Sequence, residues 1–590
     1  MKNAIKTIKS ALKEATVKAF GDELQNLELS VNPASNPTFG DFQSNVAMTL
    51  SKQLKQPPRA IAEQIVKNLQ ANDIYETPTI AGAGFINFKL EKSFLESQIN
   101  AIKNDSDKLQ RAGVAKVEKP RKVIVDMSSP NIAKEMHVGH LRSTIIGDSI
   151  ARTFEFLGHD VIKVNHVGDW GTQFGMLIAE LKEKYPSALT ESEALDLGDL
   201  VDFYKQSKKH FDEDAEFKAR AHQEVVSLQS GDANSIKAWK LLCDQSRKAF
   251  NEIYKTLDIQ NLHERGESFY NDMLAGTVKE LEEKGIAVED QGAKCVFLDG
   301  YLNEEGKPLP LIVQKRDGGF NYAATDISAV RHRVDQDKAD EIVYVVGAEQ
   351  ALHLQMMRLA AQKAGWLPDT VRTTHVGFGA VLGEDGKKLK TRSGETVRLQ
   401  DLLDEAVQHA REDLDTRFGE KGRSESPEWK ENVSQLIGIG AVKYADLSLN
   451  RMTNYHFSFK KMLSLQGNTA PYMMYAYVRV RGISREGGID FDKLDDKASV
   501  LLNEPAELEL AKQLLKLDDV LESVVEEFLP NRICEYIFEL SQRFNQFYEA
   551  CPVLNAAEPV RTSRLILCDL TARSIRIGMT LLGIQLPERM

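Results

Sequence analysis

Cysteine is scarce in this chain of 590 residues. The five cysteines are widely scattered and form no C-x-x-C pair: Cys243, Cys295, Cys534, Cys551 and Cys568. An odd number without paired spacing argues against a disulfide framework and against a zinc ribbon. We therefore expect reduced, mostly buried thiols and no structural metal.

Long hydrophobic runs are also missing, since no window approaches the roughly 18 continuous apolar residues of a membrane span. The first part of the chain has no apolar signal core either. Its apolar positions recur about once per helical turn, which favours an ordinary amphipathic helix: Ile5, Ile8, Leu12 and Val17. A mitochondrial presequence would favour Arg and avoid acids, whereas this segment uses Lys and contains Glu14. We expect a cytoplasmic protein without a membrane partner.

Positive charge is in deficit, because the net charge is −12. Phosphate binding relies on Lys and Arg, so this average taken alone argues against a nucleic-acid partner. The segment from Arg561 to the end is nevertheless locally basic, with five arginines against Asp569 and Glu588. A local stripe of this kind leaves RNA binding open.

The length suggests three or four domains, and 42% hydrophobic residues allow sizeable cores. Residues 82–90 (GAGFINFKL) predict a strand near the end of an N-terminal α/β part. The charged stretch 101–121, closed by Pro120, is typical of a linker. A strand at 122–126, a helix ending at Gly158 and a strand at 161–167 then form a βαβ unit, which predicts a parallel sheet.

The remaining pattern predicts a doubly wound α/β domain followed by a helical bundle. Residues 185–290 are charged and helical in period, and we interpret them as an insertion into the sheet domain. Strand signals return at four places: 294–298, 311–314, 341–346 and 376–382. From about residue 430 the pattern is helical almost to the end. The predicted domains are therefore 1–115, 116–440 and 441–590.

The segment DMSSPNIAKEMHVGHLRST (126–144) is the most informative one. It runs from the end of the first parallel strand to a helix N-terminus, where α/β folds bind ligands and phosphate. His137 and His140 could hydrogen-bond phosphate oxygens that gain charge during a displacement, and Gly139 permits close backbone approach. Two nearby histidines alone are more often structural, but the strand–loop–helix context favours a site.

The H-V-G-H motif resembles the signature of class I aminoacyl-tRNA synthetases, and S-S-P-N-I-A-K resembles its arginine-specific form of bacterial type. The resemblance extends from GDFQSN (40–45) to the last residue. It implies a Rossmann-like catalytic domain and a usually monomeric enzyme. Such an enzyme joins arginine to the α-phosphate of ATP, supplied with Mg²⁺, and transfers it to the 2′-hydroxyl of tRNA(Arg). Many family members activate arginine only when tRNA is bound, and the same is expected here.

The lysine-rich loop that class I enzymes place after their last strands is degraded in this chain. The segment GEDGKKLKTRSGE (383–395) offers cations but no strict K-M-S-K-S signature. The resemblance implies that Lys388 is catalytic and that Lys134, three residues before His137, supplies a replacement cation. The ATP site it implies consists of Pro130, His137, Gly139, His140, Lys388, Lys390 and Arg392. Taken alone, the 387–392 cluster could equally be a solvated turn.

Arginine recognition requires carboxylates for the guanidinium group. Tyr322 and Asp326 stand four residues apart at a helix start, hence on one face, and match the family's pair for the substrate side chain. Asp126 and Asn131 match positions that hold the substrate's amino and carboxylate ends, and Gln350 faces the same crevice. Each residue has an ordinary structural explanation alone, but five in matching order favour a binding site.

Two further stretches concern tRNA. Tyr475 and Arg479 lie on one face of the predicted helix in 466–483, and an aromatic residue with an arginine suits stacking on unpaired bases. An amphipathic bundle helix explains the pair equally well. The resemblance places Met590 near the anticodon and implies that Phe85 and Asn87 touch the tRNA elbow.

Three alternatives compete with this interpretation. Another class I synthetase is disfavoured because cysteine ligands are absent and Tyr322 with Asp326 suits a cationic substrate. A tRNA-binding relative without catalysis would have lost the histidines or the acids, which are present. A dinucleotide-dependent oxidoreductase is disfavoured because no G-x-G-x-x-G follows the first strand.

Overall fold

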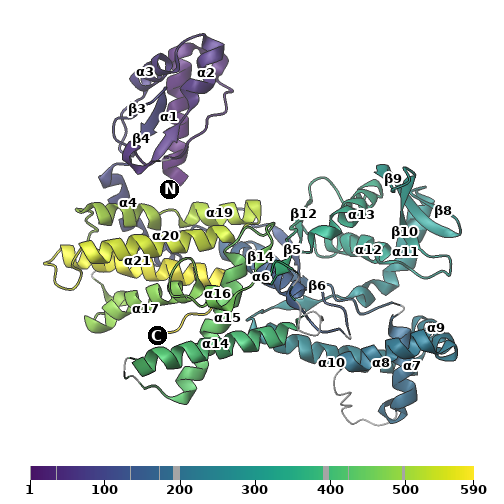
Figure 1. Cartoon of the computed structure of the whole chain (residues 1–590). Coiled ribbons are helices and arrows are strands. Elements are labelled where there is room, and N and C mark those ends of the chain that lie inside the picture. Colours follow the sequence, from purple (N-terminus) through teal and green to yellow (C-terminus); the bar gives the residue numbers. More distant parts are fainter. Residues whose placement is uncertain are drawn as a thin grey trace.

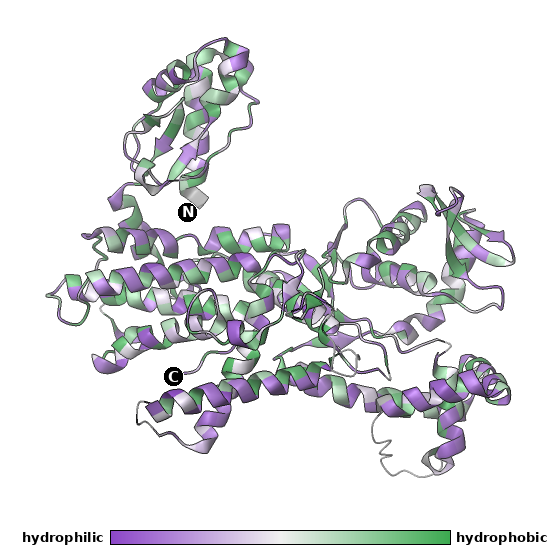
Figure 2. Cartoon of the chain, in the orientation of Figure 1, coloured by the Kyte–Doolittle hydropathy of each residue, from purple (hydrophilic) through white to green (hydrophobic). Residues whose placement is uncertain are grey.

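The computed structural model describes residues 2–34, 36–132, 134–171, 173–189, 200–383, 385–387, 389, 397–420, 422, 424–494 and 498–590. An N-terminal lobe stands apart above a C-terminal helical bundle, and the sheet-containing region lies beside the bundle (Figure 1). No helix among these described residues is long and apolar enough to cross a membrane. Hydrophilic and hydrophobic residues alternate along the long helices, as amphipathic packing requires (Figure 2).

The N-terminal lobe packs helices on a small antiparallel sheet. The first helix, α1 (Lys2–Phe20), buries Ile8 and Leu12, so the predicted amphipathic helix is confirmed. The sheet has the order β1-β2-β4-β3. Its strands and the other helices are β1 (Asn32–Pro33), β2 (Phe42–Ser44), β3 (Thr79–Ala81), β4 (Phe85–Phe88), α2 (Val46–Leu54) and α3 (Pro58–Asn68).

The expected linker at 101–121 is partly helical, which corrects the sequence-based prediction. Helix α4 (Lys92–Lys103) is followed by α5 (Ser106–Gln110), whose first amides are accepted by the Asp105 side chain. The α4 helix docks on the C-terminal region, because Asn100 accepts the N–H of Val500 at 2.9 Å. Phe94, Leu95 and Ile99 form the buried apolar face of α4. They come just before the charged stretch, so the composition of that stretch did not predict a helix.

A five-stranded parallel sheet of order β12-β11-β5-β6-β7 forms the centre of the molecule. The predicted βαβ unit is confirmed as β5 (Lys122–Asp126), α6 (Val138–Leu157) and β6 (Asp160–Asn165). Gly158 ends α6 in the left-handed conformation, with a φ of 94°. The other strands are β7 (Leu262–Glu264), β11 (Glu341–Tyr344) and β12 (Arg372–His375).

The region 185–290 differs from a simple helical insertion. After α7 (Gln173–Lys184), this region continues with the helices α8 (Leu200–Glu213), α9 (Ala215–Gln229) and α10 (Ala233–Thr256). The chain then returns to the parallel sheet as β7, a strand too short and polar to be predicted. The next elements are α11 (Asn271–Glu283), β8 (Ala287–Asp290), β9 (Ala293–Leu302), β10 (Pro308–Gln314) and α12 (Tyr322–Asp335). The strand signals at 294–298 and 311–314 thus belong to a separate antiparallel sheet, β10-β9-β8.

The rest of the chain is mainly helical, as predicted. Helix α13 (Ala351–Lys363) lies between β11 and β12, and β13 (Val381–Leu382) pairs with β14 (Tyr455–His456). The helices that follow are α14 (Leu399–Glu420), α15 (Pro427–Leu447), α16 (Phe459–Met462), α17 (Ala470–Glu486), α18 (Pro505–Leu514), α19 (Leu517–Glu527), α20 (Asn531–Ala550) and α21 (Val560–Leu581). All five cysteines are buried and free, as expected.

Candidate active site

The loop between β5 and α6 carries local backbone strain. Ser128 and Ser129 are consecutive non-glycine residues in the left-handed region, with φ of 70° and 54°. Such residues persist only when their surroundings hold them. The N–H of Ser128 donates to Ser143 Oγ at 2.8 Å, and that of Ser129 donates to Asn165 Oδ1 at 2.9 Å. The strand end and the helix start are therefore fixed relative to each other.

The two histidines form the cap of α6. His137 Nδ1 accepts the N–H of Gly139, and His140 Nδ1 accepts the N–H of His137, both at 3.0 Å. The ring centroids are 4.0 Å apart. Because each Nδ1 accepts a backbone proton, each neutral ring carries its own proton on Nε2. Two N–H donors are thus set at the helix N-terminus.

Both rings are held in the neutral form. Burial, followed by the neighbouring His137 and Lys134, lowers the pKa of His140 to about 3. Burial and Lys134 also lower the pKa of His137 below its ordinary value. The histidines can therefore donate hydrogen bonds to an anion near neutral pH without carrying a full positive charge.

The neighbours of the histidines show why the loop has this sequence. A Cβ at Gly139 would lie 2.8 Å from His137 Cε1, so a side chain there would displace the ring. Pro130 is buried, and its carbonyl accepts the N–H of Gly168 at 3.1 Å. Lys134 is exposed, with Nζ 5.8 Å from the centre of the Tyr204 ring on α8.

The cationic loop after β13 is described only at its base. Gly383 donates its N–H to Lys387 O at 2.8 Å, and His456 Nδ1 lies 3.2 Å from Gly383 O. Lys388, Lys390 and Arg392 lie outside the described residues.

Tyr322 and Asp326 lie on the first turns of α12, as predicted. Tyr322 is 57% exposed. Asp326 Oδ2 is 2.6 Å from His353 Nε2, and Oδ1 is 3.5 Å from His166 Nε2. The His353 ring also packs edge-on against Tyr322, with centroids 4.7 Å apart. Sequence reasoning missed both histidines, although His353 follows Gln350 by only three residues.

The carboxylates of Asp169 and Glu267 join that of Asp326. We term these three residues the acidic cluster. Burial, followed by Asp326 and Asp169, raises the pKa of Glu267 to about 8. Burial also raises the pKa of Asp169, whose oxygens accept the N–H and the hydroxyl of Ser268 at 2.8 and 2.6 Å. Among the described residues, no lysine or arginine forms an ion pair with these three groups. The arrangement disfavours three negative charges until a cation enters.

Glu267 was also missed from the sequence. It begins a short 3₁₀ helix, Glu267–Tyr270, directly after β7. An acid at the carboxyl end of a parallel strand would have been a candidate ligand, but β7 itself was not predicted.

Asp126 has a different partner from the expected substrate amino group. Its Oδ2 is 2.6 Å from Arg333 Nη2, and its Oδ1 accepts the Ser129 hydroxyl at 3.2 Å. Arg333 is buried on α12, two turns beyond Asp326. Since a buried arginine requires a carboxylate, Asp126 fastens α12 to the end of β5.

Asn131 and Gln350 are exposed at the ends of their loops. Asn131 forms a bridge to Gly168, where a Cβ would lie 2.0 Å from Asn131 Oδ1. Gln350 closes the turn Ala348–Gln350 and precedes α13. Both amides remain accessible at the carboxyl edge of the parallel sheet.

The residues expected to touch tRNA differ in accessibility. Tyr475 is 48% exposed on α17. Arg479 donates to Asn545 Oδ1 at 3.1 Å and lies 4.9 Å from the centre of the Tyr548 ring, so α17 and α20 share this surface. Met590 is partly buried at the chain end.

Asn87 is only 1% exposed, which corrects its expected direct contact with RNA. Its Oδ1 accepts from Gln43 Nε2 at 2.8 Å inside the N-terminal sheet. The amide is needed there to orient Gln43, and the neighbouring Phe85 is partly exposed.

Comparisons with known proteins find matches over nearly the whole length of this chain. Family models match residues 3–90 (arginyl tRNA synthetase N terminal domain), 100–459 (tRNA synthetases class I (R), catalytic domain) and 473–590 (DALR anticodon binding domain). Arginine–tRNA ligases of Synechococcus elongatus and Nostoc punctiforme are 60% and 59% identical over 583 residues, covering 99% of each chain. The arginyl-tRNA synthetase structure of Plasmodium falciparum is 32% identical, with a TM-score of 0.83 and 99% of each chain covered. That of Thermus thermophilus, at 23% identity and a TM-score of 0.77, shares the fold.

Proposed function

This chain belongs to the arginyl-tRNA synthetases, and from that premise we propose which of its residues bind arginine, ATP and tRNA. The chain is an arginine–tRNA ligase that charges tRNA(Arg) with arginine. In the proposed reaction the arginine carboxylate attacks the α-phosphate of ATP, pyrophosphate leaves, and the arginyl group passes to the terminal 2′-hydroxyl. ATP enters as its Mg²⁺ complex, so the ion is part of the substrate.

The acidic cluster is the observation that carries the proposed arginine site. Asp326 pairs with the guanidinium group, Glu267 accepts from it after losing its proton, and Tyr322 covers the side chain. Guanidinium forms strong paired hydrogen bonds with carboxylates, and a bound cation offsets the burial and the repulsion from Asp326 and Asp169 that raise the pKa of Glu267. Asn131 and Gln350 hold the amino and carboxylate ends, while Asp126 positions α12 through Arg333.

The capped start of α6 is the proposed ATP site. The Nε2–H groups of His137 and His140 donate to phosphate oxygens as charge develops on them, and Gly139 lets the nucleotide approach the backbone. Lys134 supplies a cation from the same loop. Pro130 supports the loop, and the proposed site also includes Lys388, Lys390 and Arg392.

The remaining proposals concern tRNA and the whole molecule. Tyr475 and Arg479 stack on anticodon bases with Met590 nearby, while Phe85, supported by Asn87, meets the tRNA elbow. The proposed division is 1–115, 116–440 and 441–590. We further propose that the enzyme acts as a monomer in the cytoplasm and activates arginine only when tRNA(Arg) is bound.

The first test is ATP–pyrophosphate exchange with arginine, with and without tRNA(Arg), with lysine and canavanine as controls. Exchange that requires both arginine and tRNA is the expected result. Exchange with lysine at a comparable rate would contradict the proposed role of the acidic cluster. Folded protein without exchange under any of these conditions would contradict the catalytic assignment.

A further inference from the structure

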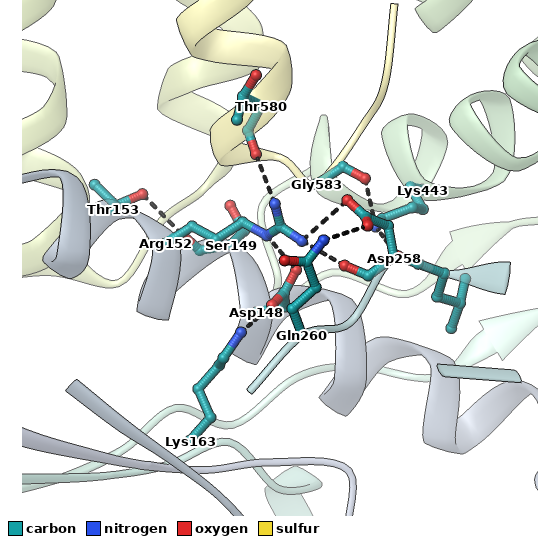
Figure 3. Close-up of polar contacts among 11 residues, drawn as sticks. Asp148, Ser149, Arg152, Thr153, Lys163, Asp258, Gln260, Lys443, Thr580 and Gly583 are labelled. Atoms are coloured by element: carbon teal, nitrogen blue, oxygen red, sulfur yellow. Dashed lines mark hydrogen bonds and ion pairs between the residues drawn. The ribbon is translucent and has the colours of Figure 1, made fainter. Parts of the chain in front are cut away.

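A second group of charged side chains is gathered around the second half of α6, beyond Gly147 (Figure 3). It consists of two acids and three bases, which we term the joint: Asp148, Arg152, Lys163, Asp258 and Lys443. Asp148 Oδ1 accepts from Lys163 Nζ at 3.0 Å, and its Oδ2 accepts from Arg152 Nε at 2.6 Å. Asp148, Lys163 and Lys443 are at most 3% exposed.

The cations of the joint hold the C-terminal ends of two helices. Lys443 Nζ donates to Leu257 O at 2.6 Å, just after α10, and to Gly583 O at 2.7 Å, just after α21. Arg152 reaches the same two ends through Asp258 O and, at 3.5 Å, Thr580 O. Carbonyls at helix C-termini carry partial negative charge, so cations stabilise them. Both helices are thereby fastened to α6 and α15.

Lys443 depends on this geometry for its charge. Among the described residues it forms no ion pair with a carboxylate, and its ammonium rests on the two helix-end carbonyls. Burial lowers the pKa of Lys443 to about 8, while the nearby Asp148 favours the charged form. A displacement of either helix end would remove an acceptor from a buried ammonium group.

The end of α21 approaches the joint closely at Gly583. A Cβ at Gly583 would lie 2.6 Å from Lys443 Nζ and 3.0 Å from Asp148 Oδ2, and Gly583 has a positive φ of 66°. A second contact fixes α15, which carries Lys443, against α6, since Asp446 on α15 pairs with Arg142 Nε of α6 at 3.0 Å. Movement of α21 against α6 must therefore move the joint.

Three helices that meet at the joint, α6, α10 and α21, lead to parts of the proposed site. Helix α6 begins at the two histidines, and the chain after α10 runs through β7 to Glu267. The chain after α21 ends at Met590, seven residues beyond Gly583. The segments that carry the proposed ATP, arginine and anticodon contacts are thus all held together at the joint.

We propose that Lys443 and Arg152 are positioning residues for arginine activation, which transmit the placement of the end of α21 to His137, His140 and Glu267. The inference rests on the proposed function, because it assumes that tRNA contacts the chain end. In this scheme the anticodon affects the kcat of ATP–pyrophosphate exchange through Lys443 and Arg152.

The experiment compares wild-type enzyme with Lys443→Met in tRNA-dependent exchange at saturating arginine and ATP. Two transcripts are used: tRNA(Arg) and the same tRNA with a changed anticodon base. In the wild type we expect kcat with the cognate transcript to exceed kcat with the changed one at least tenfold. In Lys443→Met the cognate kcat should fall at least tenfold and the ratio should drop below threefold, while tRNA binding stays within threefold.

Arg152→Lys provides a second variant that retains a cation but cannot reach both helix ends at once. It should lower the kcat ratio in the same way, even if Lys443→Met fails to fold. Lys493→Met is the matched control, since the Lys493 side chain is 83% exposed and pairs, within the part of the chain that the structure describes, only with Asp490. It should leave kcat and the ratio unchanged.

The outcomes separate the two proposals. Absence of exchange in the wild type would overturn the proposed function itself. Exchange in the wild type with a kcat ratio near one would overturn the inference, because no anticodon signal would exist. A folded Lys443→Met or Arg152→Lys enzyme that keeps the wild-type ratio would also overturn it, even if its stability were reduced.

Discussion

The acidic cluster and the joint are both groups of charged side chains, yet their carboxylates are neutralised differently. Asp148 and Asp258 in the joint pair with Lys163 and Arg152 at short distances. Asp326 in the acidic cluster faces His353 and His166, and Glu267 has a pKa raised to about 8. Strand β6 contributes to both, through Lys163 to the joint and through the adjoining His166 to the cluster.

The difference separates structural charge from functional charge. Buried carboxylates that have their own cations hold elements together, and removing one leaves an uncompensated cation. Buried carboxylates without a cation destabilise the empty protein and stabilise it when a cation binds. Mutations in the two clusters should therefore affect different measurements.

The largest expected effect on catalysis is the loss of arginine use in Asp326→Asn. Removing one partner of a desolvated charge pair costs about 2–5 kcal/mol, so kcat/KM for arginine should fall by roughly 1.5 to 3.5 orders of magnitude. ATP binding and the melting temperature should stay close to wild type. The control is Asp335→Asn on the same helix, which changes a 52% exposed side chain. Equal losses for arginine and ATP would contradict the assignment.

The converse change is Asp148→Asn in the joint. It leaves Lys163 and Arg152 without their shared carboxylate and should lower the stability of this region by about 3–5 kcal/mol. Thermal or urea unfolding measures the loss. Asp160→Asn removes the exposed pair with Lys122 and should cost less than about 1 kcal/mol. An unchanged melting temperature for Asp148→Asn would show that the joint is not structural.

A smaller effect concerns pH and Glu267. Because its pKa in the arginine-free protein is about 8, Glu267 is mostly protonated at pH 7 and must lose a proton when guanidinium binds. The KM for arginine should fall as pH rises from about 6 to 8, by up to roughly tenfold per unit. Calorimetry in buffers of different ionisation enthalpy should detect the released proton. Glu267→Gln should flatten the profile, and a steep profile in that variant would contradict the linkage.

The smallest effect should come from a surface that neither cluster reaches. Tyr475→Ala removes a proposed stacking platform worth about 1–3 kcal/mol, so the KM for tRNA should rise roughly tenfold, and kcat for arginine activation should fall less than it does with the changed anticodon base. Val226→Ala, a substitution of a 55% exposed residue on α9, should change neither constant. A loss in kcat alone for Tyr475→Ala would argue against stacking.

The sequence predicted the elements whose patterns are local and strong. The β5–α6–β6 unit, the histidine cap and the i,i+4 pair on α12 all follow from periodicity and motif spacing. It could not predict β7, because three residues of mixed polarity give no strand signal, and Glu267 was lost with it. Asp126 and Arg333 are 207 positions apart in the sequence. Lys443 is 186 positions from Leu257 and 140 positions from Gly583. No local sequence pattern reveals such distant pairings.

The docking of α4 has a practical consequence for dividing the chain. Asn100 and Glu96 accept the amide protons of Val500 and Leu502, so α4 acts as part of the bundle's outer wall. A cut after residue 115 would strip this wall and leave two backbone donors and an apolar groove open to water. A cut just before Lys92 would detach the N-terminal lobe and keep the wall. Grafting lobes between relatives, or mapping protease-sensitive sites, is therefore best begun near residue 91.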